Sequence, residues 1–217
     1  MLSDKIMKIL MKLMMPLVIR LRLYRVFWSL IALLFPKRGA AWLATVDHEE
    51  WGAKDAAYII RAAQEYSVPL GVVMDYGCGY GRVAKHVAPH VRELICADVS
   101  PTYLARAKRW LKGFSNVKYL LVNGKDLKQV PDSSIDIVYS IGVFVHINRR
   151  DAALLSLEVA RVLKPRGLFI VELPNPDAEW PSFEKYFHQD IENFVKPYQI
   201  LERHVGKTII RLILRKP

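Results

Sequence analysis

Short apolar runs alternate with helix-length segments over most of this chain, and this alternation constrains its fold more than any other feature. The runs are six to eight residues long and rich in β-branched or aromatic side chains, as buried strands are. Helices between strands favour parallel pairing through right-handed crossovers. The alternation therefore predicts an α/β fold with a mostly parallel sheet. The five runs are Gly71–Tyr76, Val91–Asp98, Val117–Val122, Ile135–Ser140 and Leu168–Leu173.

The segments between these runs carry helical signals. Ser100 is a plausible N-cap, and Pro101 suits the first helical position. The end of the chain differs, because the two strands expected at Tyr198–His204 and Thr208–Arg215 are too close together for a crossover helix. They are expected to form an antiparallel hairpin. The expected helices are Glu49–Tyr66, Gly79–Ala88, Pro101–Lys112 and Arg149–Leu163.

A glycine-rich loop, Asp75-Tyr76-Gly77-Cys78-Gly79-Tyr80-Gly81, follows the first run and opens the next helix. Glycines let the backbone turn sharply and approach a ligand without obstruction by side chains. Asp98 ends the following run, where a carboxylate can accept hydrogen bonds from both hydroxyls of a ribose. The loop and this acid together predict a site for a nucleoside-containing cofactor.

The spacing of the glycines is G-x-G-x-G rather than the dinucleotide fingerprint G-x-G-x-x-G. The segment from Asp75 to Gly81 resembles the first motif of the class I S-adenosylmethionine-dependent methyltransferases. Four further stretches resemble motifs of that family in the same order: VRELICADVSPTYLARAK, NGKDL, VPDSSIDIVYSIGVFVHI and ARVLKPRGLFIVEL. The resemblance covers about residues 49–217.

The resemblance implies a seven-stranded, mostly parallel Rossmann-like sheet with an antiparallel C-terminal hairpin and helices on both faces. It also implies S-adenosyl-L-methionine as cofactor and a methyltransferase domain over residues 46–217. Residues 1–45 would be a separate basic, amphipathic helical segment.

The resemblance also implies roles for individual residues. Asp75 would orient the loop or reach the methionine amino group through water, while Gly77 and Gly79 would lie against the methionine and ribose. Asp98 would hold the ribose, and Val99 would pack on the adenine. The full set of expected cofactor contacts is Asp75, Gly77, Cys78, Gly79, Gly81, Asp98, Val99, Asn123, Gly124 and Ser140.

Asn123 departs from the family pattern, which usually has an aspartate facing the adenine amino group. An amide oxygen can accept the same hydrogen bond, so the adenine contact is still expected there. Gly124 could offer its backbone N–H to the ring, and Ser140 ends the fourth strand under the methionine.

Methyl transfer from a sulfonium needs alignment, desolvation and sometimes a base, but no metal. His146 follows the fourth strand and is the candidate base, since an unperturbed imidazole titrates near pH 6.5; packing is its alternative role. Cys78 and Cys96 are too few for a disulfide framework and are expected to be buried, reduced thiols. Candidates for the acceptor pocket are Glu172, Asn175, Trp180, Tyr186 and His188.

Positive charge is concentrated at the start of the chain. The net charge is +11, and residues 1–38 carry +7 of it, from eight lysines and arginines against one aspartate. Ile6, Ile9, Leu10, Leu13 and Leu17 share one helical face, and Pro16 can begin a second helix. A basic amphipathic anchor on an anionic membrane surface is the favoured interpretation. A signal peptide and a spanning helix fit less well, and a helical cap on the main domain is the alternative.

The favoured function is methyl transfer to a small-molecule, lipid-linked or glycan acceptor, in the cytoplasm or at the inner face of the membrane. A tRNA methyltransferase is the main alternative, because the stretch SIGVFVHINRRDAALLSLEVARVLKPRG resembles wobble-uridine carboxymethyl-ester methyltransferases. A module that binds the cofactor without catalysis is a third possibility. The sequence leaves the oligomeric state open.

Overall fold

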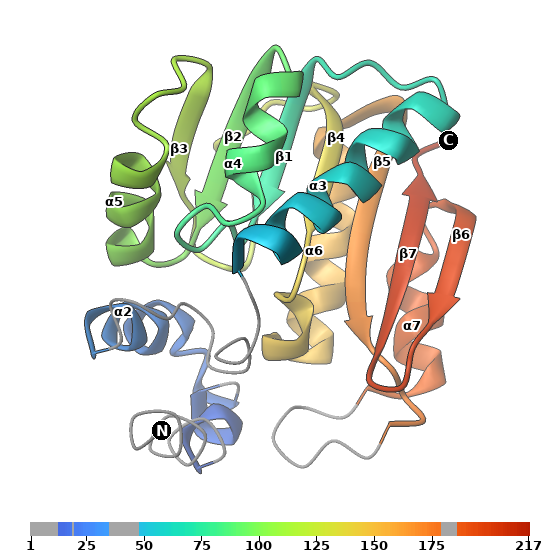
Figure 1. Cartoon of the computed structure of the whole chain (residues 1–217). Helices are drawn as coiled ribbons and strands as arrows, with labels where there is room; N and C mark the ends of the chain where they lie inside the picture. Colours follow the sequence, from blue (N-terminus) through green and yellow to red (C-terminus); the bar gives the residue numbers. More distant parts are fainter. Residues whose placement is uncertain (1–12, 19, 35–47, 179–185) are drawn as a thin grey trace.

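The computed structural model describes residues 13–18, 20–34, 48–178 and 186–217 (Figure 1). These residues form one seven-stranded sheet with the order β3-β2-β1-β4-β5-β7-β6. All neighbouring strands from β3 to β5 pair in parallel, and β7 is antiparallel to both β5 and β6. The strands are β1 (Val72–Tyr76), β2 (Glu93–Asp98), β3 (Val117–Leu121), β4 (Ile135–Ser140), β5 (Leu163–Pro174), β6 (Gln199–Val205) and β7 (Ile209–Arg215).

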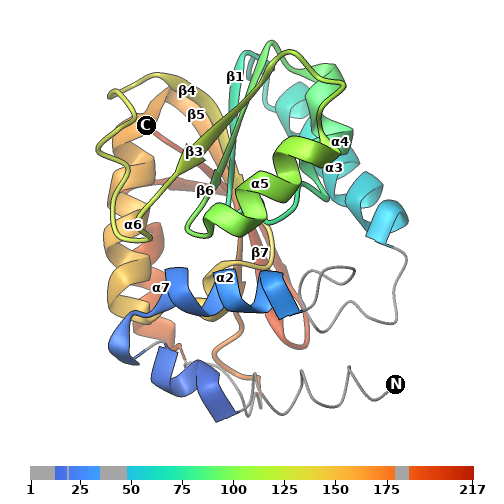
Figure 2. The ribbon, with the colours of Figure 1, turned by 90° about the vertical axis from the view of Figure 1, so that its left-hand side faces the viewer.

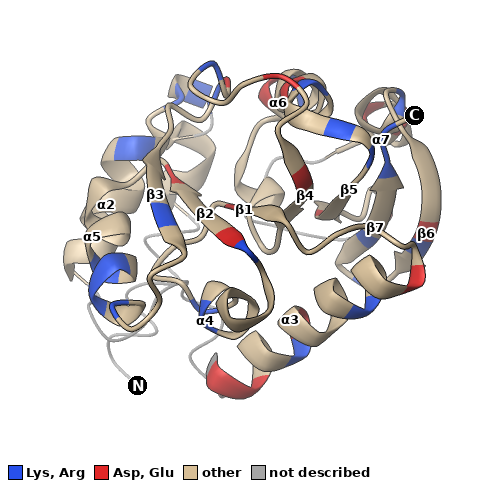
Figure 3. Cartoon of the chain, turned by 90° about the horizontal axis from the view of Figure 1, so that it is seen from above, with Lys and Arg blue, Asp and Glu red and all other residues tan. Residues whose placement is uncertain are grey.

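Helices cover both faces of this sheet, which confirms the predicted fold class (Figure 3). On one face, α3, α4 and α5 bury apolar side chains such as Ile59, Val87 and Leu104. On the other, α6 and α7 bury Leu155 and Phe194. The helices are α2 (Tyr24–Leu34), α3 (His48–Glu65), α4 (Ala84–Val87), α5 (Pro101–Trp110), α6 (Arg149–Val162) and α7 (His188–Val195), with 3-10 turns η2 (Ala88–His90) and η3 (Phe144–His146).

Two predicted helix boundaries were wrong. The helix expected over Gly79–Ala88 is reduced to α4, because Gly79 and Gly81 adopt positive φ angles of 55° and 96° that no α-helix accepts. Near the start of the chain, Pro16 does not divide two helices, because Met15 before it is helical. The break comes instead at Arg22, which has a left-handed φ of 56°.

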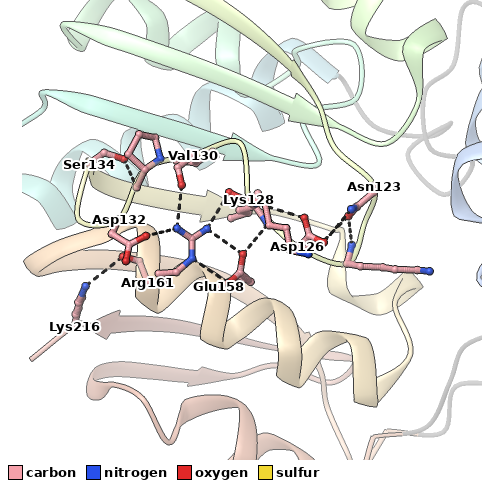
Figure 4. Close-up of polar contacts among 12 residues, drawn as sticks. Asn123, Asp126, Lys128, Val130, Asp132, Ser134, Glu158, Arg161 and Lys216 are labelled. Carbon is pink, nitrogen blue, oxygen red and sulfur yellow. Dashed lines mark hydrogen bonds and ion pairs between the residues drawn. The ribbon is translucent and has the colours of Figure 1, made fainter.

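The long connection between β3 and β4 is held against α6 by Arg161 (Figure 4). The Arg161 guanidinium donates to the carbonyls of Leu127 and Val130 at 2.9 and 3.0 Å, and it pairs with the carboxylates of Asp132 and Glu158 at 2.5 and 3.0 Å. Glu158 in turn accepts from the backbone N–H of Leu127 at 2.9 Å. This network fixes the loop that follows β3 at the edge of the site described next.

The described part of the N-terminal segment lies across the carboxyl end of the sheet (Figure 2). We call residues 13–18 and 20–34 the cap. Its buried side chains, among them Met15, Phe27 and Ile31, form a small core of their own with a contact to Val99. Among the described residues, no helix is long and apolar enough to cross a membrane.

Candidate active site

A cavity of about 310 Å³ lies where the carboxyl ends of β1, β2 and β4 meet the cap. Ligands of open α/β sheets bind at this end of the strands. The cavity walls come from the glycine loop, the residues after β2, β3 and β4, Tyr103 of α5, the cap, and the start of α3 with β5 and β7. Seven of the ten expected cofactor contacts line it: Asp75, Gly77, Cys78, Gly79, Asp98, Val99 and Gly124.

The glycine loop presents bare backbone to the cavity. Gly77 and Cys78 donate their N–H groups to the carbonyl of Ala97 at 2.7 and 3.0 Å, which fastens the loop to β2. Gly77 has a φ of 82°, and a Cβ atom there would lie 2.3 Å from Val143 Cγ2. A Cβ on Gly79, in contrast, would meet no atom within 4 Å. Gly77 is therefore needed for close packing, and Gly79 leaves open space for a ligand.

Asp98 lies at the end of β2 with its carboxylate buried in the cavity wall. Its Oδ2 accepts from Gly79 N–H at 2.9 Å, and its Oδ1 accepts from Ser100 N–H at 2.8 Å. Each carboxylate oxygen has a second lone pair for a ligand hydroxyl. Burial raises the pKa of Asp98 to about 6, against the opposing effect of these backbone hydrogen bonds.

Asp75, at the end of β1, is also buried in the cavity wall. Burial raises the pKa of its carboxyl group to about 7, although the nearby Tyr139 hydroxyl and Arg82 guanidinium oppose the shift. A buried carboxylate with such a pKa would be stabilised in its charged form by a cationic ligand group.

Three expected contacts do not line the cavity. Asn123 is exposed, and its side-chain oxygen accepts from the backbone N–H groups of Lys125 and Asp126 at 2.7 and 3.0 Å. Ser140 is buried and donates to the Tyr76 carbonyl at 2.8 Å, which joins β4 to β1. Gly81 packs on Leu111 of the α5 layer. The adenine-side and methionine-side roles of Asn123 and Ser140 gain no support from these positions.

His146 lines the cavity in η3 and is buried. Its ring meets Trp28 of the cap edge to face, with 4.8 Å between ring centroids. Burial lowers the pKa of His146 to about 3, so the imidazole is neutral near pH 7. A neutral imidazole can accept a proton, but a conjugate acid with this pKa makes it a weaker base than an exposed histidine.

The other end of the cavity is charged. Asp55 of α3 pairs with Arg82 and Arg211, both at 2.9 Å. Arg211 also donates from Nε to Glu172 at 3.0 Å, and Glu172 accepts from Gly142 N–H at 3.0 Å. Of the acceptor-pocket candidates, only Glu172 therefore reaches the cavity within the described residues. Trp180 lies outside them.

The remaining acceptor candidates have structural contacts. Tyr186 is buried and donates to the carbonyls of Phe144 and Ile147. His188 is exposed beside Asp177, and Asn175 donates to the Gly206 carbonyl. Cys78 and Cys96 are buried free thiols, as expected.

A helical cap on the domain was the alternative interpretation of the N-terminal segment, but no cap residue was among the predicted site residues. Tyr24 and Trp28 line the cavity, and the Tyr24 hydroxyl accepts from Asn148 at 3.1 Å from the backbone and 2.9 Å from the side chain. Arg22 pairs with the buried Asp151 at 2.7 Å. The only sequence signal was the aromatic content of a helix whose position relative to the domain was unknown.

The fold is that of a nucleoside-cofactor domain, and its cavity lies between the sheet and a helical cap. A family model described as "Methyltransferase domain" matches residues 74–171. A probable S-adenosylmethionine-dependent methyltransferase of Mycobacterium tuberculosis is 33% identical over 103 residues, 48% of this chain and 35% of that protein. A demethylmenaquinone methyltransferase of Tropheryma whipplei is 30% identical over 167 residues, 76% of this chain and 62% of that protein. The chain thus spans between about a third and two thirds of these relatives.

The fold is shared with solved structures. An S-adenosylmethionine-dependent methyltransferase from Clostridium acetobutylicum superposes with a TM-score of 0.65 over 89% of this chain and 98% of that one, at 15% identity. The family match, these relatives and the shared fold identify residues 74–171 as part of a class I S-adenosylmethionine-dependent methyltransferase domain, the family whose cofactor is S-adenosyl-L-methionine.

The cavity fits this cofactor. Open space over Gly79 is the kind of cradle that a ligand fills, and the buried carboxylates of Asp98 and Asp75 match a ribose and an ammonium group. When bound, the cofactor supplies a methyl group on a sulfonium that is already activated for transfer.

Proposed function

We propose that this protein transfers the methyl group of S-adenosylmethionine to a small, largely apolar acceptor held under the cap. Asp98 accepts hydrogen bonds from the ribose hydroxyls, Val99 and Gly124 border the adenine, and Asp75 favours the cationic methionine end. The observation that carries the proposal is the buried Asp98 carboxylate beside the open backbone of Gly79.

The apolar part of the cavity wall supports the proposed acceptor class. Trp28, Val145 and Ile147 give this wall apolar surface, and the paired charges of Asp55, Glu172 and the two arginines nearly neutralise one another. Apolar walls with a few polar groups suit a small lipophilic molecule. The demethylmenaquinone methyltransferase relative is named for an acceptor of this kind.

The alternative of a tRNA methyltransferase gains no support. The basic residues of the cap that the structure describes are partly committed to the body: Arg22 pairs with Asp151, and Arg25 donates to the Val122 carbonyl at 3.1 Å. A module that binds the cofactor without catalysis would differ from the proposed methyltransferase only in having no turnover. It would bind the cofactor and leave every acceptor unmethylated.

The direct test combines calorimetry with labelled cofactor. We expect S-adenosylmethionine to bind with one site per chain. Incubation with S-adenosylmethionine carrying a labelled methyl group, and with fractionated lipids, polar metabolites and tRNA, should place the label in the lipid or small-molecule fraction. Label in tRNA alone would contradict the proposed acceptor, and cofactor binding without any labelled product would favour the binding module.

We expect His146→Asn to lower turnover by about tenfold and to change cofactor affinity less than threefold. A well-matched general base contributes about 10²–10⁴, but the pKa of about 3 reduces what this imidazole can supply. Steady-state kinetics on the identified acceptor, with calorimetry for the cofactor, separates the two effects. Wild-type turnover in the variant would leave His146 with a packing role against Trp28.

We also propose that the protein is cytoplasmic and works against the inner face of an anionic membrane, with residues 1–38 supplying the attraction through their net charge of +7. Each lysine or arginine near such a surface contributes about 1 kcal/mol. We expect Lys5→Gln/Lys8→Gln/Lys12→Gln to weaken sedimentation with anionic vesicles by roughly a hundredfold. Lys108→Gln/Lys112→Gln/Lys118→Gln on the body is the control. Equal sedimentation of both variants at low salt would refute this role of the segment.

A further inference from the structure

The cap exposes eight leucine and valine side chains, and Val26, Leu30 and Leu33 lie on the face of α2 opposite its buried one. We call these eight side chains the outer face of the cap. Val26 and Leu33 are each about two thirds exposed, at 65% and 64%, and Leu13 is 72% exposed. Exposed apolar patches of this kind mark interaction surfaces in soluble proteins. Its members are Leu13, Leu17, Leu21, Leu23, Val26, Leu30, Leu33 and Leu34.

The helical spacing separates this face from the buried one. In α2, Tyr24, Phe27 and Ile31 recur at three- and four-residue steps and are buried, while Val26, Leu30 and Leu33 recur at the same steps and are exposed. The helix therefore has apolar side chains on two faces. The inner one covers the cavity, and the outer one contacts no described part of the chain closely enough to be buried.

The charge of the same segment indicates which partner covers the outer face. The cap contains no acidic residue, and its Arg22 and Arg25 are held by Asp151 and by the Val122 carbonyl. The basic character that remains comes from the exposed Arg20 and, in the sequence just before the cap, from Lys5, Lys8 and Lys12. Apolar side chains beside basic ones suit the boundary between anionic headgroups and acyl chains. A partner that contacts only the basic residues would leave the exposed leucines of the outer face in water, whereas a membrane surface covers both.

We infer that the outer face of the cap inserts into the headgroup boundary of a membrane and thereby holds the cap, whose inner face covers the cavity, at the lipid surface. The inference rests on the proposed function, because a lipid-soluble acceptor could then pass from the bilayer to the cavity under α2. The cap is held on the body by the contacts of Tyr24 with Asn148 and of Arg22 with Asp151.

The first test uses labelled cysteines in the full-length protein. Cys78 and Cys96 are buried, so a polarity-sensitive dye should attach to V26C or L33C. L157C on α6, with Leu157 56% exposed, is the matched control. Vesicles of phosphatidylcholine and phosphatidylglycerol should shift dye emission to the blue at V26C and L33C but not at L157C. No shift at the cap positions, or an equal shift at all three, would overturn the inference.

The second test measures binding to the same vesicles. Val26→Gln/Leu33→Gln should lower partitioning by at least about tenfold, because each side chain loses most of its transfer free energy. Leu154→Gln/Leu157→Gln should change it less than threefold. Cofactor affinity should be the same in both variants as in the wild type. If the wild-type protein binds vesicles but not the cofactor, the proposed function is refuted while the membrane surface stands. Concentration-dependent dimers that bury the outer face without lipid would overturn the inference in favour of a second copy.

Discussion

Gly77→Ala is expected to abolish measurable cofactor binding and to lower the free energy of unfolding by about 2–5 kcal/mol. A left-handed backbone costs an alanine about 1–2 kcal/mol, and forcing a methyl group into a packed site costs about 1–3 kcal/mol more. Both apply, since φ is 82° and the added Cβ would lie 2.3 Å from Val143 Cγ2 and 2.8 Å from Cγ1. Denaturant unfolding and calorimetry measure the two effects.

Two other glycines are controls for this substitution. Gly113→Ala, in the turn after α5, places its Cβ in open space at an ordinary φ and should be nearly neutral. In Gly79→Ala the added Cβ also meets no neighbouring atom, but the backbone there has a left-handed φ of 55°. This substitution should cost about 1 kcal/mol of stability while still weakening the cofactor, because its methyl group enters the ligand space. Unchanged cofactor affinity in a folded Gly77→Ala protein would show that the loop is not the binding site.

The second large effect is expected for Asp98→Asn, which should weaken S-adenosylmethionine binding by about ten- to a hundredfold. Charge-assisted hydrogen bonds contribute about 1.5–3 kcal/mol, and an asparagine cannot accept from Gly79 N–H and the ribose as a carboxylate does. Calorimetry at pH 8 measures the loss.

Asp136→Asn is the matched control. Asp136 is also a buried carboxylate that accepts a backbone N–H, from Val72 at 2.7 Å, and it pairs with Lys164 at 2.8 Å away from the cavity. It should lose stability but keep its cofactor affinity. A loss of affinity of the same size in both variants would show that Asp98 acts only through the fold.

The pH dependence of binding checks the same assignment in the wild type. The pKa values of Asp98 and Asp75 are raised to about 6 and about 7, so both groups become charged as the pH rises through this window. Affinity should therefore rise between pH 5 and 8, with proton release near pH 6.5. Stability of the ligand-free protein should fall from about pH 4 to about pH 7 and then level off, because between these values the folded state holds protons that the unfolded chain has released. Affinity independent of pH would contradict a contact with either carboxylate.

Features set by nearby residues could be predicted from the sequence. The glycine loop and Asp98 sit at strand ends, and a short stretch of chain determines their geometry. The predicted adenine contact of Asn123 gains no support from its position, because its side-chain oxygen accepts from the N–H groups of Lys125 and Asp126. An Asx turn of this kind competes with any ligand for the same oxygen.

The cap could not be placed from its own sequence. A helix with apolar side chains on two faces is consistent with membrane contact and with domain contact, and the periodicity does not choose between them. The choice depends on partners more than a hundred residues away, as in the contact of Tyr24 with Asn148. The break at Arg22 is also a tertiary effect, since its pairing with Asp151 accompanies the left-handed backbone there.

The position of β7 has a consequence for how the protein is made. β7 lies between β5 and β6 in the sheet, although it follows both in the chain. During synthesis on the ribosome, β5 is therefore exposed along one edge until Ile209–Arg215 has emerged, and the residues along that edge, Leu168–Leu173, are apolar except for Glu172. An open apolar edge can pair with another nascent chain. We expect newly made chains to need protection by a chaperone until β7 inserts, and ribosome-bound chains stopped before residue 209 to aggregate more readily than complete ones.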